Sequence, residues 1–121
     1  MPEGIMELTA ADFAEKTARG VFLVDFYGSW CPPCRALEPE LVRLAEFFRG
    51  RARIARINVD DHSEAAVDNQ VEEIPTLIFF RDGREMKRLF GAHSFESLSG
   101  ALAELIPGDG TEGISGDLPK S

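Results

Sequence analysis

The sequence predicts an α/β protein, a three-layer sandwich in which helices cover both faces of a central mixed β-sheet. Three observations carry this prediction. Helical and extended patterns alternate along the chain, and the extended run 21–27 is apolar almost throughout, as a strand covered on both faces requires. Asp82-Gly83 lies between two later extended runs and predicts a hairpin, which adds an antiparallel pair. The 121 residues fit a single domain.

In the first half of the chain, Thr9 and Asp12 resemble a capping box and begin a helix that ends at Gly20. Pro32 and Pro33 suit a first helical turn, whose amides have no partner inside the helix. Leucines at helical spacing continue that helix, and Pro39 should kink it. The predicted elements are a helix at 10–18, a strand at 21–27, a turn at 28–33 that opens a helix to about residue 49, and a strand at 52–59.

In the second half, Ser63 and Ser94 are predicted helix caps, and Pro107 ends the last helix. The predicted elements are a helix at 63–69, strands at 76–80 and 86–90, and a helix from 94 to 106. Residues 108–121 are rich in Gly, Asp and Ser and have too little apolar surface to offset the entropy cost of ordering. We therefore expect a domain at 1–107 and a flexible acidic C-terminal tail at 108–121.

Composition argues against several functions. The net charge is −8, from 13 basic and 21 acidic residues, and we find no basic stripe of the kind that nucleic-acid binding needs. No apolar run approaches the ~20 residues of a membrane span, and the N-terminus does not resemble a signal peptide. We expect a cytoplasmic location. We also expect a monomer, because packing the helices leaves no apolar stripe exposed.

The two cysteines, Cys31 and Cys34, carry the clearest chemical signal. Cys31 falls where a buried strand ends and a helix begins, and the free amides and partial positive charge of a helix N-terminus stabilise a thiolate. Cys34 lies one turn further on and is expected to be more deeply buried. The spacing predicts a redox disulfide, in which Cys31 attacks a substrate disulfide and Cys34 resolves the mixed disulfide.

Three alternatives remain open at this point. The cysteines could bind a metal, but tetrahedral zinc needs four ligands, and His62 and His93, which we expect in solvent-exposed loops, fall in no metal-binding spacing. They could also be inert buried thiols. A third reading is a binding module, in which the fold acts as an adaptor and uses a groove or the acidic tail instead of the thiols.

Two further positions stand out. Asp25 lies in the middle of the apolar run, where burial should raise the pKa of its carboxyl. Behind the cysteines, such a carboxyl can take the proton from Cys34. Pro75 directly precedes a strand and is a candidate cis-proline, although sequence physics does not place it beside the cysteines.

These residues resemble the thioredoxin family. The likeness is strongest at residues 24–34, VDFYGSWCPPC, and continues through Pro39, Asn58-Val59-Asp60, Ile74-Pro75-Thr76, Phe80, Asp82-Gly83 and Gly91. It covers roughly residues 8–105. The resemblance implies the thioredoxin fold and the activity of a thiol-disulfide oxidoreductase that reduces protein disulfides. It also implies that no metal or organic cofactor is used and that a partner reductase, such as thioredoxin reductase, supplies the electrons.

The resemblance also assigns site residues. Cys31 matches the nucleophile, Cys34 the resolving thiol and Asp25 the buried acid. The substrate-binding positions are Trp30, Pro32, Ile74, Pro75 and Gly91. Among them, Pro75 matches a cis-proline beside the cysteines, and the Ile74 backbone matches the position that pairs with a substrate strand.

The chain departs from the family pattern at three places. Pro32-Pro33 stands where Gly-Pro is typical, which leaves a more oxidising, isomerase-like potential as the rival direction. Arg56 stands where a lysine is usual, and an arginine pointing inward would hold Asp25 ionised and weaken it as a base. Glu72-Glu73 precedes Ile74, and this pair should favour basic partners.

Overall fold

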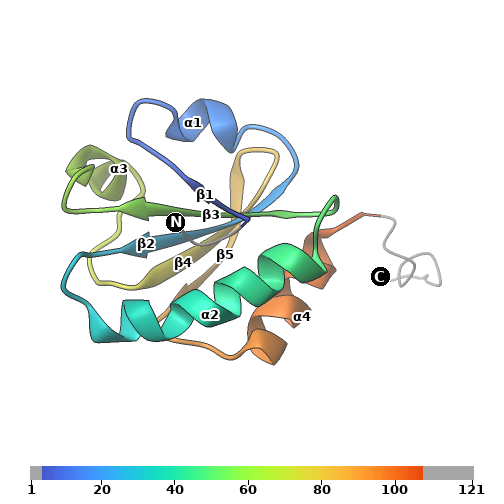
Figure 1. The fold of residues 1–121 in the computed structure, drawn as a ribbon. Coiled ribbons are helices and arrows are strands. Elements are labelled where there is room, and N and C mark those ends of the chain that lie inside the picture. Colours follow the sequence, from blue (N-terminus) through green and yellow to red (C-terminus); the bar gives the residue numbers. More distant parts are fainter. Residues whose placement is uncertain (1–3, 108–121) are drawn as a thin grey trace.

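The computed structural model describes residues 4–107 and confirms the predicted fold class (Figure 1). The tail predicted at 108–121 lies outside the described residues. In chain order the elements are β1 (Ile5–Glu7), α1 (Phe13–Lys16), β2 (Val21–Tyr27), α2 (Pro32–Phe47), β3 (Arg53–Asn58), α3 (Ser63–Asp68), β4 (Thr76–Arg81), β5 (Arg84–Phe90) and α4 (Phe95–Leu105).

The five strands form one mixed sheet in the order β1-β3-β2-β4-β5. The apolar run of β2 lies at the centre, parallel to β3 on one side and antiparallel to β4 on the other. Six of its seven residues are buried, as the sequence predicts for a strand covered on both faces. The hairpin joining β4 and β5 turns at Asp82 and Gly83, which both have positive φ, as a two-residue hairpin turn requires.

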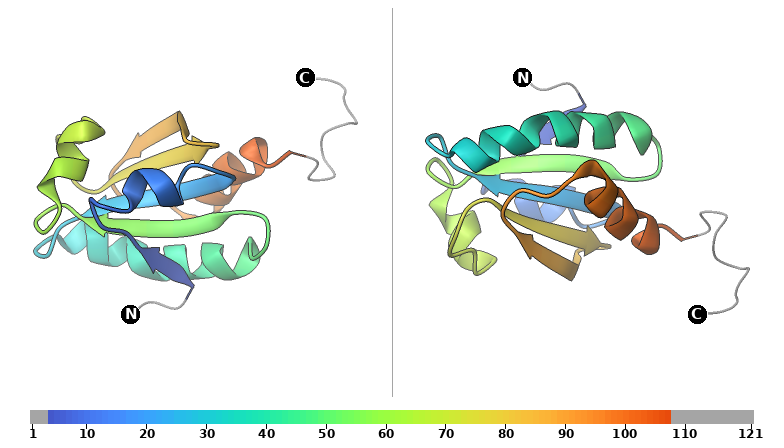
Figure 2. Two further views of the ribbon diagram at one scale, coloured as in Figure 1. Left: turned by 90° about the horizontal axis from the view of Figure 1, so that it is seen from above. Right: turned by 90° about the horizontal axis from the view of Figure 1, so that it is seen from below.

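Helices cover both faces of the sheet, with α1 and α3 on one side and α2 and α4 on the other (Figure 1). Figure 2 shows α1 over the sheet from above, and α2 and α4 nearest the viewer from below. Two apolar clusters fill the space between the layers. One packs leucines of α2 and α4 on the sheet, and the other packs Phe13 and Ala65 against its opposite face. Burial of these clusters holds the chemical site on a rigid frame.

The structure corrects three local predictions. The short strand β1 was not predicted, because three residues at a sheet edge carry no readable alternation. Thr9 and Asp12 do exchange the expected hydrogen bonds, at 2.8 and 3.2 Å, but residues 10–12 form a turn and helical geometry begins only at Phe13. The cap of α3 is His62, with no side-chain bond, so that Ser63 is already helical.

Of the remaining predictions, the cap of α4 is confirmed and the start of β5 is not. Ser94 Oγ accepts the amide of Ser97 and caps α4 as expected. Pro39 lies inside α2 with its ring exposed, and the helix continues past it to Phe47. Strand β5 begins two residues earlier than predicted, because the turn uses only Asp82 and Gly83.

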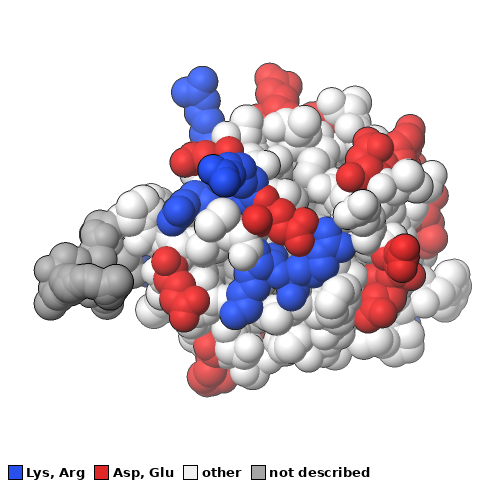
Figure 3. Space-filling model, turned by 180° about the vertical axis from the view of Figure 1, so that it is seen from behind, with Lys and Arg blue, Asp and Glu red and all other residues white. Residues whose placement is uncertain are grey.

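The surface mixes both signs of charge. On the face seen in Figure 3, acidic and basic side chains lie side by side and not in separate areas. Among residues 4–107, no helix has the length and apolar character needed to cross a membrane.

Candidate active site

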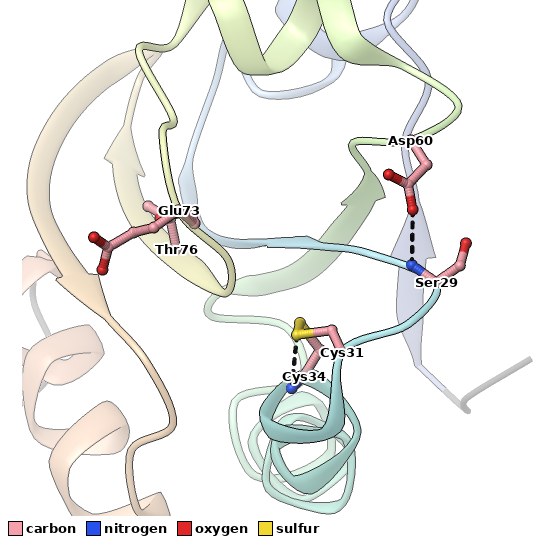
Figure 4. The surroundings of a disulfide bond; sticks show 6 residues. All are labelled: Ser29, Cys31, Cys34, Asp60, Glu73 and Thr76. Atoms are coloured by element: carbon pink, nitrogen blue, oxygen red, sulfur yellow. Dashed lines mark hydrogen bonds between the residues drawn. A yellow bond between two sulfur atoms is a disulfide. The ribbon is translucent and has the colours of Figure 1, made fainter.

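Cys31 and Cys34 form a disulfide at the start of α2, with their Cα atoms 5.2 Å apart. Cys31 is the N-cap of this helix and has an extended backbone, and Pro32 and Pro33 fill the first turn. The Sγ of Cys31 accepts a hydrogen bond from the Cys34 amide at 3.3 Å, drawn in Figure 4. Strand β2 ends at Tyr27, so the strand-to-helix junction predicted from sequence is present.

The two cysteines are equally buried, with 4% of Cys31 and 6% of Cys34 exposed. The prediction that Cys34 is the more buried is therefore wrong for the oxidised protein, in which the bond between the sulfurs holds both at one place. Their surroundings differ instead. Cys34 lines a cavity of about 170 Å³ that it shares with Asp25 on β2, whereas Cys31 does not line it.

Asp25 is buried as predicted, with 3% of its surface exposed. Its Oδ1 has no hydrogen-bond partner among the described residues. The pKa of this carboxyl is raised from 3.8 to about 7, chiefly because burial disfavours its charged form. The charge of Arg56 lowers this pKa, and the charges of Glu38 and Glu7 raise it. A carboxyl with this pKa exchanges a proton readily near neutral pH.

Arg56 does not hold Asp25 ionised. It is the neighbour of Asp25 in the register of β2 and β3. Its Nε lies 2.7 Å from Glu7 Oε1, and its Nη1 lies 3.9 Å from Glu38 Oε2. The guanidinium is thus paired with two other carboxylates, and the net effect of the surroundings still raises the pKa of Asp25.

The predicted substrate-binding residues come from three segments of the chain. Trp30 is 88% exposed and Pro32 is also exposed, next to the disulfide. The Ile74–Pro75 bond is cis, as the resemblance implies. Pro75 is buried and its carbonyl accepts the Gly91 amide at 2.9 Å, which ties the segment before β4 to the end of β5. Ile74 remains partly exposed beside this segment.

Sequence reasoning missed several residues that shape the site. Asp60 Oδ2 accepts the Ser29 amide at 3.0 Å (Figure 4). Asn58 donates to Ser29 Oγ at 3.2 Å, so the end of β3 and the turn after it hold the loop before Cys31. Gly28 is buried against Ile74. Gly28, Ser29, Asn58 and Asp60 all lie in segments that carry the family likeness. Glu7 carried no such signal, because its strand was not predicted.

Gly28 is expected to be a site where a single methyl group disturbs substrate binding. A Cβ at this position would lie 2.6 Å from Ile74 Cδ1, so the Ile74 side chain must move. We expect Gly28→Ala to raise KM several-fold with kcat little changed. It should cost no more than about 1 kcal/mol of stability, the low end for overpacking, because the contact is with the end of a flexible, partly exposed side chain. Steady-state kinetics and denaturant unfolding measure both effects.

Gly100→Ala is the matched control for this variant. Gly100 lies within α4, and a Cβ there meets nothing within 4 Å. The control should therefore gain roughly 0.5–1 kcal/mol from helix propensity and leave KM unchanged. An unchanged KM in Gly28→Ala would show that Ile74 does not have to keep its position for substrates to bind.

Residues 4–107 contain no group of three or more His, Cys, Asp or Glu side chains placed to hold a metal ion. His62 Nδ1 accepts the Ala10 amide at 3.2 Å, and His93 Nε2 lies 3.0 Å from the Phe90 carbonyl. Both histidines are half-buried rather than solvent-exposed as expected. His62 contacts the backbone of a distant segment, and His93 contacts that of Phe90, three residues earlier. The fold, with a disulfide at the N-terminus of α2 and a buried acid behind it, defines a dithiol–disulfide redox protein.

Comparison with known proteins agrees. The sequence model of the thioredoxin family matches residues 4–104. Thioredoxins from two strains of Staphylococcus aureus are 40% identical over 98 residues, which is 81% of this chain and 94% of theirs. The solved structure of a mutant thioredoxin from Halobacterium salinarum NRC-1 superposes with a TM-score of 0.78 at 29% identity, covering 87% of this chain and 93% of that one.

The chain belongs to the thioredoxin family. It has the thioredoxin fold and is a protein-disulfide oxidoreductase that works by dithiol–disulfide exchange through its cysteine pair. Membership of this family implies disulfide-containing substrates and a reductase that returns electrons to the protein.

Proposed function

We propose that the protein reduces protein disulfides, with Cys31 as the nucleophile and Cys34 as the resolving thiol. The observation that carries this assignment is the place of Cys31 at the N-cap of α2, where its sulfur accepts the Cys34 amide. That amide and the helix dipole favour a negative sulfur. The helix N-terminus and the place next to the exposed Trp30 suit the attacking cysteine.

The reaction then proceeds in two exchanges. The Cys31 thiolate attacks one sulfur of the substrate disulfide, and the other substrate sulfur leaves as a thiolate. Cys34 gives its proton to Asp25 and attacks Cys31 Sγ, which releases the second substrate thiolate and closes the Cys31–Cys34 disulfide. The two cysteines thereby lose two electrons, and the substrate disulfide gains them. Asp25 suits the proton transfer because it shares a cavity with Cys34.

The rim around the disulfide, whose residues range from exposed to buried, is the proposed docking surface for substrates. It consists of Trp30, Pro32, Ile74, Pro75 and Gly91. The side chains of Glu72 and Glu73 are exposed directly before Ile74 and would favour partners with basic residues near their disulfide.

The cellular setting is proposed on the same basis. We place the protein in the cytoplasm as a monomer of one domain, residues 1–107, reduced by a thioredoxin reductase and without a nucleic-acid partner. The acidic balance of the chain, at net charge −8, is consistent with the last point.

The reduction potential of the Cys31–Cys34 pair tests the direction of this proposal. Equilibration in defined thiol buffers, read by the fluorescence of Trp30, the one tryptophan of the chain, gives the value. We expect a potential near the about −270 mV of thioredoxins, which makes the protein a reductant. A potential near the about −180 mV of disulfide isomerase would make it an oxidant or isomerase.

Pro32→Gly is the matched variant for this measurement, because it restores the Gly-Pro pair that is typical of the family. The difference between the two proteins isolates the contribution of Pro32 to the potential. If no disulfide formed at any thiol ratio, dithiol exchange through these cysteines would be ruled out. An adaptor role would then be the favoured function.

A further inference from the structure

One row of residues crosses the sheet beneath the redox site. Arg56 on β3 lies in register with Asp25 on β2 and, on its other side, with Glu7 on β1. On the far side of Asp25 the row continues with Leu77 of β4, which carries no charge. Residues in register on adjacent strands point to the same face. Arg56 therefore has a carboxyl group on each side and can pair with either.

Arg56 pairs with Glu7. The contact from Nε to Glu7 Oε1 is 2.7 Å, and both side chains are largely buried, with 19% and 30% exposed. The second oxygen of Glu7 accepts the Tyr27 hydroxyl, also at 2.7 Å. The guanidinium carbon lies 4.6 Å from the centroid of the Tyr27 ring. Tyr27 and Glu7 thus fix the guanidinium from two directions.

Among the charged groups around Asp25, Arg56 is the cation that lowers the pKa of its carboxyl, whereas Arg35, which also lines the cavity, is not among the groups that shift it. The cavity beside Asp25 is lined by Cys34, Arg35 and Glu38 from α2, together with Tyr27 and Arg56. Glu38 adds a negative charge and also contacts Arg56, at 3.9 Å. Among the described residues, neither β4 nor α4 contributes a lining side chain. Asp25 Oδ1 remains without a hydrogen bond.

We propose that Glu7 is a positioning residue of the redox site, which holds Arg56 through its carboxylate and so keeps that cation from pairing with Asp25. The consequence is that Asp25 binds and releases a proton near neutral pH, where its ionised form can take the proton of Cys34. This consequence for turnover rests on the proposed role of Asp25. The positioning itself does not, because it concerns the resting, oxidised protein.

The test is a ¹³C NMR titration of the Asp25 carboxyl in the oxidised protein, in which no thiol titrates and no substrate is present. In Glu7→Gln the side chain that holds Arg56 loses its charge, so the guanidinium of Arg56 can turn to Asp25. An opposite charge within hydrogen-bonding reach lowers a carboxyl pKa by about 1–3 units. We therefore expect the titration midpoint to fall by at least about 1 unit. Glu40→Gln, which removes an exposed partner of Arg43 on the same helix as Cys34, should leave it unchanged.

A double variant separates positioning from the direct charge of Glu7. If Glu7 acts through Arg56, then Glu7→Gln should shift the Asp25 midpoint little in an Arg56→Gln background. An equal shift in both backgrounds, or no shift in Glu7→Gln alone, would overturn the proposal.

Tyr27→Phe keeps the test decisive if Glu7→Gln does not fold. It removes the hydroxyl that holds Glu7 and changes no charge, so the expected shift has the same direction and a smaller size. An unchanged midpoint in this variant would then overturn the proposal. Since turnover is not measured, a protein in which Asp25 plays no part in catalysis would still give a clear answer.

Discussion

Replacing Cys31 by serine is expected to lower turnover of disulfide substrates by roughly 10³-fold or more, the scale on which enzymes lose activity with their nucleophile. A serine hydroxyl at the N-cap can accept the Cys34 amide as the sulfur does, so the helix should keep its start. It cannot attack a disulfide at neutral pH. Release of the coloured thiolate from an aromatic disulfide under stoichiometric conditions measures the loss.

Cys34→Ser is the matched variant and should fail at the following step. Its Cys31 still attacks, so one substrate thiolate is released per protein and the mixed disulfide accumulates, which mass spectrometry detects as an adduct. Without Cys34 nothing resolves it. Accumulation of the adduct in Cys31→Ser, in place of Cys34→Ser, would reverse the two roles. Partner binding that survives in both variants while no exchange is measurable in the wild type would favour the adaptor.

Asp25→Asn is expected to gain stability relative to the wild type as the pH rises from acid to alkaline. The carboxyl pKa is raised to about 7 in the folded protein, because burial disfavours its charged form, and returns to 3.8 on unfolding. Asp25 thus favours the fold fully below pH ~4, and this contribution is lost as the pH rises to ~7. Asparagine does not titrate and has no such loss.

The size of the effect follows from the two pKa values. At 1.36 kcal/mol per unit, the stability difference between variant and wild type should grow by roughly 4 kcal/mol from pH ~4 to pH ~8. Denaturant unfolding at a series of pH values measures it. Asp61→Asn, on an exposed turn, is the control and should show no such trend. A difference that stayed constant with pH would mean that Asp25 is not protonated in the folded protein.

Much of the fold could be predicted because its central elements carry local signals. A few neighbouring residues are enough to predict each of three elements: the apolar run of β2, the turn at Asp82-Gly83 and the cap at Ser94. All three are confirmed. The short elements could not be predicted as well. Helix α1 has four residues, and its capping pair forms without extending the helix back to residue 10.

The residues of the site, like the elements of the fold, could be predicted from local signals only in part. The cysteines and Asp25 lie within ten residues of one another, so their chemistry is readable from the strand-to-helix junction alone. Ile74, Pro75 and Gly91 are forty or more residues away, and only the family resemblance placed them in the site. Glu7 was found by neither route, because its importance depends on β1 lying in register with β3.

The two edges of the sheet differ from its centre in a way that matters for a protein that receives extended partners. At one edge β1 is only three residues long. At the other, β5 begins with the exposed, largely charged residues 84–87, and its register with β4 shifts between Phe79 and Phe80. Short, charged or irregular edges are poor templates for strand addition. Copies of the molecule therefore have little means of joining edge to edge into aggregates, which is compatible with the proposed docking of a partner's backbone at Ile74.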